Sequence, residues 1–195
     1  MNRTATIKRK TNETDITLKL DLDKSIKKHI NTGSAFLDHM LDLFSTHGGI
    51  GLSVECKGDV DVDMHHSSED IAICLGEALL KAVGNKKGIE RFGHYYVPMD
   101  EALVRTVLDL SGRISFVFKG KLKNNIVGNL ETEMIIHFFQ SFAQAAKINL
   151  HIDIIRGSNT HHCIEGIFKS FARALSMAIS SSTRVRGIPS TKGML

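Results

Sequence analysis

The chain of 195 residues has no tryptophan and only three cysteines, Cys56, Cys74 and Cys163. An odd number of cysteines without a repeated spacing argues against a disulfide framework and is typical of a reducing cytoplasm. The sequence also lacks an apolar segment long enough to span a membrane, and its first residues lack the apolar stretch of a secretory signal. We therefore expect a cytoplasmic protein without a membrane partner.

Strong charge of one sign is also missing, because the formal net charge is only +4 at pH 7. A nucleic-acid-binding protein would more often carry a dense basic stripe with interleaved aromatic residues, so we expect no nucleic-acid partner. No GxGxxG or Walker-type glycine loop precedes a helix, which argues against a nucleotide-phosphate site. The scattered basic residues fit a small anionic substrate equally well.

The chain does have a repeated histidine motif. Two adjacent histidines are followed by a glutamate and then by an apolar helical stretch. The two copies are His65, His66 and Glu69, and His161, His162 and Glu165. Positions i and i+4 of a helix share one face, as do i and i+3, so each copy sets a carboxylate beside an imidazole. The neighbouring imidazole points about 100° away around the axis, a geometry that suits two metal ions rather than one.

Each motif ends a longer internal match. An amphipathic helix with a histidine, His39 or His137, comes first, a β-like run follows at 51–56 or 149–155, and a second helix follows the motif. Further strands are predicted at 4–10, 16–22, 102–110 and 114–119. Each half therefore has the order strand, strand, helix, strand, helix.

This order predicts an α+β fold in which each half is a small sheet with helices on one face. We expect two half-repeats, 1–87 and 88–195, that together form one compact catalytic domain, with an irregular tail at the end of the second. A pseudo-twofold relation between the halves would bring their histidines together in a common pocket.

Six histidines and two glutamates fall at the repeated positions, and these eight are our candidate metal ligands: His39, His65, His66, His137, His161, His162, Glu69 and Glu165. Imidazole with carboxylate, without paired thiolates, suits Mn, Fe, Zn, Ni or Co rather than an iron–sulfur cluster. A single motif of this kind is as well explained by surface or capping residues, but two matched copies favour metal binding. Cys163 corresponds to Ser67 in the first copy, so we interpret this cysteine as a bystander.

Several basic residues are candidates for binding an anionic group: Arg91, Arg113, Lys169, Ser190 and Lys192. Lys169 lies one turn beyond Glu165 on the same helical face, and the arginines offer a planar fork that suits phosphate. His47 ends the first predicted helix, where a cation is favourable. It also lies two turns past His39, within reach of the same cavity, so both interpretations of His47 stay open.

Seven segments resemble the imidazoleglycerol-phosphate dehydratase family in its monofunctional form: RKTNET, FLDHMLDLFSTHG, HHSSEDIAICLGEAL, RFGHYYVPMDEAL, DLSGR, HHCIEGIFKSFARAL and PSTKG. They run from Arg9 to Gly193 in the family's order. The resemblance implies a hydro-lyase of histidine biosynthesis that converts imidazole glycerol phosphate to imidazole acetol phosphate and water. Where many members have glutamine this chain has Leu43, which removes one polar substrate contact.

The resemblance also implies a cofactor and an assembly. It implies two Mn²⁺ per active site, held by the eight candidate ligands given above. It assigns the substrate phosphate to Arg91, Arg113, Lys169, Ser190 and Lys192, and the diol end to Glu13. It further implies a homo-oligomer of 24 chains whose active sites are completed by neighbouring subunits.

The reaction gives this ligand set a physical reason. The proton to be lost is on a carbon without an adjacent carbonyl, so it is not acidic. Metal ions at the ring nitrogens would favour an imidazolate, which would expel the side-chain hydroxyl and leave a diazafulvene-like intermediate with an acidified C–H bond. Our hypothesis is that Glu69 or Glu165 shuttles the proton, with His39 beside them.

Two alternatives stay open. A di-metal hydrolase acting on a small phosphorylated substrate would release inorganic phosphate, whereas a dehydratase would retain the phosphate on a ketone product. A metal-storing module built from the same halves would show no turnover, because fold alone does not decide function.

Overall fold

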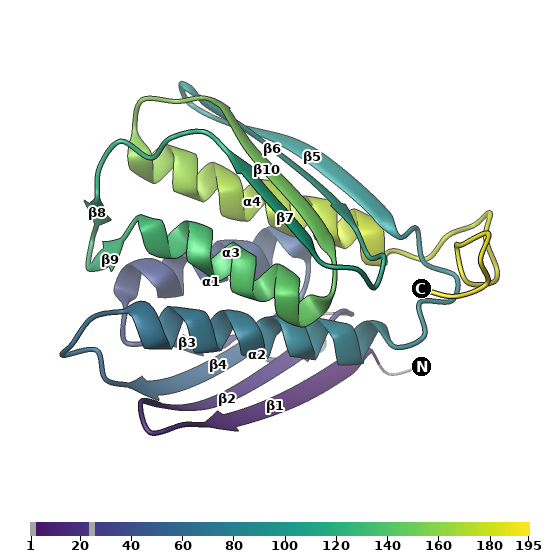
Figure 1. The fold of residues 1–195 in the computed structure, drawn as a ribbon, viewed down its shortest axis with the longest axis horizontal. Coiled ribbons are helices and arrows are strands. Elements are labelled where there is room, and N and C mark those ends of the chain that lie inside the picture. Colours follow the sequence, from purple (N-terminus) through teal and green to yellow (C-terminus); the bar gives the residue numbers. More distant parts are fainter. Residues whose placement is uncertain (1–2, 24–25) are drawn as a thin grey trace.

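Alternating apolar residues build two four-stranded sheets in the computed structural model, which describes residues 3–23 and 26–195 (Figure 1). Ile16, Leu18 and Leu20 of one strand are all fully buried, for example. The first half contains β1 (Thr4–Lys10), β2 (Thr14–Asp21), β3 (His29–Asn31), α1 (Ala35–Gly48), β4 (Gly51–Gly58) and α2 (His65–Val83). The second contains β5 (Phe92–Met99), β6 (Ala102–Asp109), β7 (Ser115–Lys119), β8 (Ile126–Val127), β9 (Leu130–Glu131), α3 (Glu133–Ala146), β10 (Asn149–Arg156) and α4 (Thr160–Ile179).

The two sheets have equivalent topologies. Their strand orders are β1-β2-β4-β3 and β5-β6-β10-β7. In each sheet the short third strand pairs in parallel with the strand between the two helices, and the other pairs are antiparallel. The predicted α+β class with small sheets is confirmed.

In each four-stranded sheet, three strands precede the first helix of that half, rather than the two that the sequence predicts. The unpredicted strands of these sheets are β3 and β5, and the short pair β8 and β9 of the second half was not predicted either. β3 is only three residues long, and β5 contains Gly93 and Pro98 and exposes five of its eight residues, so neither shows the apolar alternation of a half-buried strand. The strand predicted at 102–110 is therefore the counterpart of β2, and the one at 114–119 is the counterpart of β3.

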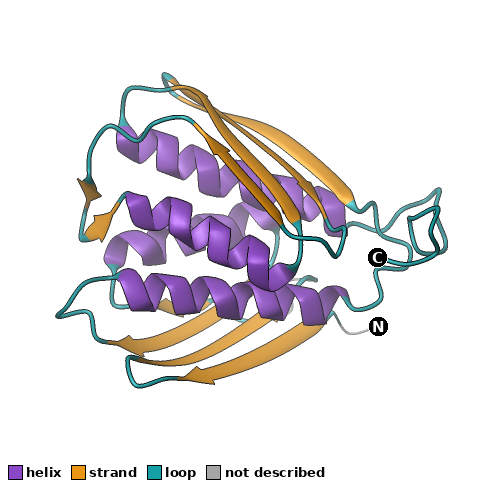
Figure 2. Ribbon diagram, in the orientation of Figure 1, coloured by secondary structure: helices purple, strands orange, loops and turns teal. Residues whose placement is uncertain are grey.

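The helices lie between the two sheets (Figure 2). α2 packs against β1 and β2, and α4 packs against β5 and β6. Between the halves, α1 packs against α4 and α2 packs against α3. Each half therefore buries the apolar faces of its helices against helices of the other half.

Aromatic side chains fill the contact between the helices. Phe171 of α4 stacks on Phe44 of α1, with ring centroids 5.5 Å apart, and meets Phe139 and Phe142 of α3 edge-on at 5.1 and 5.0 Å. Burying a phenylalanine side chain contributes about 1.5–3 kcal/mol. This single residue of α4 therefore fixes its position against both α1 and α3.

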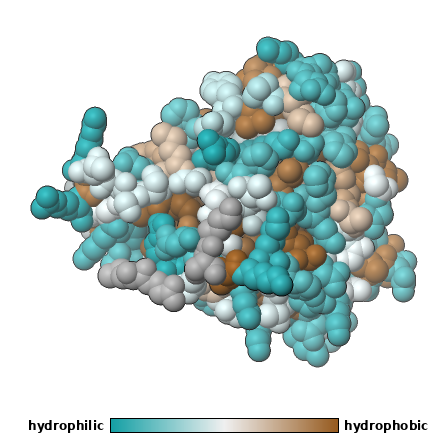
Figure 3. All heavy atoms as spheres, turned by 180° about the vertical axis from the view of Figure 1, so that it is seen from behind, coloured by the Kyte–Doolittle hydropathy of each residue, from teal (hydrophilic) through white to brown (hydrophobic). Residues whose placement is uncertain are grey.

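The surface of the molecule is mixed in character. In the rear view, the tail projects at the left, and apolar patches are interspersed with larger hydrophilic areas (Figure 3). None of the helices formed by residues 3–23 and 26–195 combines the length and the apolarity that crossing a membrane requires.

Gly76 allows the close approach of α2 and α3, and we expect Gly76→Ala to separate them. An added Cβ would lie 2.7 Å from the carbonyl oxygen of Phe142 and 2.8 Å from Ala145 Cβ. Overpacking costs roughly 1–3 kcal/mol, and alanine regains only about 1 kcal/mol in helix propensity. The expected net result is a loss of up to about 2 kcal/mol in the free energy of unfolding, measured by urea denaturation.

Gly187→Ala is the matched control, because no heavy atom lies within 4 Å of the position that its added Cβ would take. This variant should unfold at the wild-type urea concentration. Equal stabilities for the two variants at the same protein concentration would contradict the close packing of α2 on α3.

Candidate metal centre

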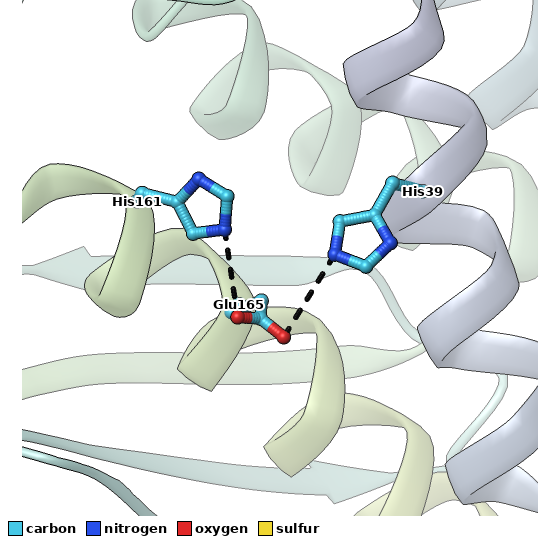
Figure 4. Close-up of side chains that lie close together, drawn as sticks. All are labelled: His39, His161 and Glu165. Carbon is cyan, nitrogen blue, oxygen red and sulfur yellow. Dashed lines mark ion pairs between the residues drawn. The ribbon is translucent and has the colours of Figure 1, made fainter.

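One histidine–carboxylate group joins α1 to α4. His39 of α1 and His161 of α4 both point toward Glu165 of α4 (Figure 4). The His39 Nε2 atom lies 3.9 Å from Glu165 Oε1, and the His161 Nε2 atom lies 3.5 Å from Glu165 Oε2. The Glu165 side chain is only 8% exposed. We call this group the Glu165 site.

A second group joins α2 to α3. His65 and Glu69 of α2 face His137 of α3, whose Nε2 atom lies 3.4 Å from Glu69 Oε1. The rings of His65 and His137 are 4.9 Å apart. The buried His137 Nε2 atom has no hydrogen-bond partner among the described residues. We call this group the Glu69 site.

Each site combines the two halves of the chain. The first helix of one half supplies a histidine, and the second helix of the other half supplies the histidine and glutamate at i and i+4. The ligand atoms within each site all lie within 4.8 Å of one another, close enough to hold a metal ion. Within one chain the structure therefore forms two groups, and the common pocket that the sequence predicts stays a prediction.

Local capping positions the motif on α4. The side chain of Asn159, the N-cap residue, accepts hydrogen bonds from the backbone N–H groups of His161 and His162 at 2.9 and 3.3 Å. This interaction starts the helix at the histidine pair. On α2 the Asp63 side chain accepts the backbone N–H of His65 at 2.7 Å, so both motifs begin at a helix N-terminus.

The second histidine of each motif is not part of either site. His66 Nδ1 lies 2.9 Å from Asp59 Oδ2, and His162 Nδ1 lies 2.8 Å from Glu101 Oε2. These hydrogen bonds raise the pKa of both histidines. A carboxylate on one ring nitrogen orients a histidine whose other nitrogen can ligate a metal.

Glu101 is itself held firmly by its surroundings. It accepts hydrogen bonds from the backbone N–H groups of Ser158 and Asn159 at 3.0 and 2.7 Å. The hydrogen bond with His162 and these two backbone bonds lower the pKa of Glu101. The carboxylate is therefore ionised, and it links the β5–β6 turn to the start of α4.

Lys169 distinguishes the Glu165 site electrostatically. Its Nζ atom lies 2.9 Å from Glu165 Oε1. Burial by itself raises the pKa of Glu165, but the hydrogen bond and positive charge of Lys169, together with both histidines, outweigh it and lower that pKa. Burial, Lys169 and Arg173 lower the pKa of His47, so His47 lies in the field of these two cations.

Glu13 lies in the turn between β1 and β2, with Oε1 3.7 Å from His66 Nε2. This placement brings Glu13 beside a motif histidine, although the two are far apart in sequence. Leu43 is partly buried and packs against the hydrophobic core.

Four of the five anion-binding candidates line one cavity of about 670 Å³: Arg91, Arg113, Ser190 and Lys192. Arg91 holds this cavity together, because it pairs with Asp109 at 2.7 Å and donates to the carbonyl oxygen of Pro189 at 2.7 Å. The fifth candidate, Lys169, lies at the Glu165 site instead.

The cavity and the two sites lie at opposite ends of the molecule. The backbone N–H of Arg91 bonds to Ala178 near the end of α4, whereas Glu165 lies near its start. The tail that lines the cavity projects beyond the end of α4 (Figure 1). The helix rises about 20 Å between Glu165 and Ala178, at roughly 1.5 Å per residue.

Comparison with known proteins identifies the family. The sequence profile of imidazoleglycerol-phosphate dehydratase matches residues 32–175. The chain belongs to the imidazoleglycerol-phosphate dehydratase family. It is 51% identical over 195 residues to the imidazoleglycerol-phosphate dehydratase of Acetivibrio thermocellus and 50% identical over 195 residues to that of Leuconostoc mesenteroides, covering 100% of both chains in each case.

Solved structures agree. The Staphylococcus aureus imidazoleglycerol-phosphate dehydratase is 41% identical with a TM-score of 0.84, covering 92% of this chain and 99% of that chain. The Pyrococcus furiosus enzyme in complex with (S)-C348 is 32% identical with a TM-score of 0.83, covering 97% and 100%. The chain is thus a hydro-lyase of histidine biosynthesis that acts on a small substrate, and the hydrolase and metal-storage alternatives lose their support.

The sequence did not reveal the carboxylate partners of His66 and His162, the second histidines of the two motifs. Asp59 precedes its histidine by seven residues in a loop, and Glu101 is some 60 residues from His162. Neither lies at a helical or strand spacing from the histidine it contacts. The only available signal was the presence of acidic residues in both loops, which surface loops commonly contain.

Proposed function

We propose that the Glu69 and Glu165 sites hold two divalent metal ions, preferably Mn²⁺, with which the enzyme dehydrates imidazole glycerol phosphate. The buried Nε2 atom of His137 supports this proposal: it lies 3.4 Å from Glu69 Oε1 but makes no hydrogen bond with the described residues, and a buried polar nitrogen without a hydrogen bond is costly unless a ligand satisfies it. Imidazole nitrogens with a carboxylate oxygen suit Mn²⁺. When bound, such ions would stabilise negative charge on the substrate's imidazole ring.

The chain's own carboxylates are placed to move the proton. Glu165 is nearly buried and is kept ionised by Lys169, so its carboxylate oxygens can accept a proton from the substrate carbon. Glu69 occupies the equivalent position in the other half. We assign the proton shuttle to one of these two glutamates, with His39 next to Glu165.

The cavity lined by Arg91, Arg113, Ser190 and Lys192 is the proposed phosphate site, because arginine and lysine donors suit a phosphate. An imidazole ring with a three-carbon chain and a phosphate is much shorter than the rise of α4 that separates this cavity from the Glu165 site. One chain therefore cannot offer both ends to one substrate molecule.

We infer that the active site is completed between chains. His66 and His162 support this inference, because each is oriented by a carboxylate and lies outside the two groups of its own chain. Glu13 lies beside His66 and would contact the diol end. A closed homo-oligomer of 24 chains, as the resemblance implies, would repeat one such contact symmetrically.

The three cysteines support the proposal that the protein functions in a reducing compartment such as the cytoplasm. All three are buried and unpaired. Burial raises the pKa of Cys56 to about 11 and that of Cys74 to about 12. These thiols are therefore protonated and unreactive at neutral pH.

We expect activity to require metal and to yield a phosphorylated ketone. Protein stripped with a chelator should not convert imidazole glycerol phosphate, and added Mn²⁺ should restore turnover. The measurement follows the ketone and inorganic phosphate in the same samples. Full activity of protein shown by elemental analysis to be metal-free would contradict the metal requirement, and phosphate release would contradict dehydration.

The glutamate shuttle is tested in the same assay. Glu69→Gln or Glu165→Gln should lose at least about 100-fold in kcat, because an amide cannot accept the substrate proton. Elemental analysis of each variant shows whether the metal is retained. Full turnover by both variants with metal retained would exclude a glutamate shuttle.

Mixed oligomers test the completion of sites between chains. His161→Ala removes a metal ligand, and Arg113→Ala with Lys192→Ala removes phosphate donors, so each parent protein should be inactive. Unfolding and reassembling the two in equal amounts should restore about one quarter of the wild-type activity, if each site draws its two ends from different chains. Homogeneous reassembly of each parent is the control. A mixture as inactive as its parents, although shown to contain both chains, would contradict shared sites.

A further inference from the structure

The two metal sites are equivalent in the duplicated fold but differ in their surroundings. Both consist of two histidines and one glutamate on corresponding helices. One turn beyond the glutamate, α4 carries Lys169 and α2 carries Ile73. Two turns beyond it, α4 carries Arg173 and α2 carries Glu77. The duplication has therefore kept the ligands and changed the charges beside them.

The Glu165 site already contains a bound cation from its own chain. Lys169 Nζ lies 2.9 Å from Glu165 Oε1, and its side chain is 17% exposed. Lys169 Nζ also lies 3.5 Å from Met99 Sδ. Arg173 follows Lys169 by one further turn, so two positive charges lie beyond Glu165 on this face of α4.

The Glu69 site lacks this positive charge. The ion pairs of the described residues include none between Glu69 and a lysine or arginine. Glu69, Ile73 and Glu77 line a cavity of about 290 Å³ together with residues of α3, among them Ala145, which corresponds to His47. The charged residues along this face of α2 are thus both acidic, and the Glu69 side chain is 36% exposed.

The positive charge of Lys169 determines which of the two sites attracts a divalent cation more strongly. An incoming divalent cation at the Glu165 site meets an ammonium within a few ångströms, whereas at the Glu69 site it meets carboxylates. Burial of Glu165 lowers the local dielectric, which strengthens attraction to the carboxylate and repulsion from Lys169 alike. Net charge then sets the order, because Lys169 cancels the charge of Glu165 and Glu69 keeps its own.

We propose that the two sites bind divalent metal with unequal affinity, the Glu69 site filling first and Lys169 making the Glu165 site the weaker one. This inference rests on the proposed metal function. It makes Lys169 a residue that sets the order of metal loading, so that at low Mn²⁺ each chain holds a single ion at the Glu69 site.

The test is Mn²⁺ binding to the full metal-free protein by isothermal titration calorimetry. Wild-type protein should show two classes of Mn²⁺ site, and each chain should contain one site of each class. The two dissociation constants should differ by at least about tenfold. Glu69→Ala should remove the tighter class, and Glu165→Ala should remove the weaker one. Circular dichroism and light scattering would confirm that each variant is folded and assembled as the wild type.

Three further variants isolate the charge. Lys169→Met should tighten only the weaker class by about tenfold, and Lys169→Arg, which keeps the charge, should leave it within about threefold of the wild type. Ile73→Lys places an ammonium at the equivalent position of α2 and should weaken only the tighter class.

Two equal classes in the wild type, or an unchanged gap in folded Lys169→Met, would overturn the inequality while leaving metal dependence intact. The same holds if Glu69→Ala removes the weaker class. Absence of Mn²⁺ binding to folded wild-type protein would instead overturn the metal function itself, and the inequality with it.

Discussion

The packing of helices from one half of the chain against helices of the other half holds both candidate sites together, and Phe171 fixes α4 in this packing through its contacts with Phe44 and α3. His39 reaches Glu165 only because α1 packs on α4. His137 reaches Glu69 only because α2 packs on α3, with Gly76 at the closest approach. No half-repeat could form either site alone, since the histidine and the histidine–glutamate pair come from different halves. Apolar packing between the halves is therefore the condition for forming both candidate metal sites.

The same architecture places the candidate metal sites and the basic cavity, proposed for the two ends of the substrate, far apart in one chain. The candidate metal sites lie near the N-terminal ends of α2 and α4, and the basic cavity lies past the C-terminal end of α4, held by Arg91 through Asp109 and Pro189. If the basic cavity binds the substrate phosphate, as we propose, a small substrate reaches both ends only where chains meet. His66 and His162, the second histidines of the two motifs, are oriented for such contacts by their carboxylate partners. The proposed active site therefore needs more than one chain.

Sequence spacing predicted the elements and side chains that follow a helical or strand period. The four helices, the strands β1, β2, β4, β6, β7 and β10, and the eight repeated histidines and glutamates follow from spacing, because side chains at i and i+4 share a face whatever the rest of the chain does. The strand β5 was missed because Gly93, Pro98 and exposed residues mask its alternation. The exchange of partners between halves, the pairing of Arg91 with Asp109 and the carboxylates Asp59 and Glu101 depend on tertiary packing. Sequence spacing contains no information on such contacts between distant segments.

The most direct test of the central claim is to locate the metal. Crystals of the Mn²⁺-loaded protein, measured at the manganese absorption edge, give anomalous difference peaks only where manganese is bound. The account predicts two peaks per chain, one among His39, His161 and Glu165 and the other among His65, Glu69 and His137, each within ligand distance of the nitrogen and oxygen atoms. Manganese bound elsewhere, with both groups of side chains left without a peak, would contradict it.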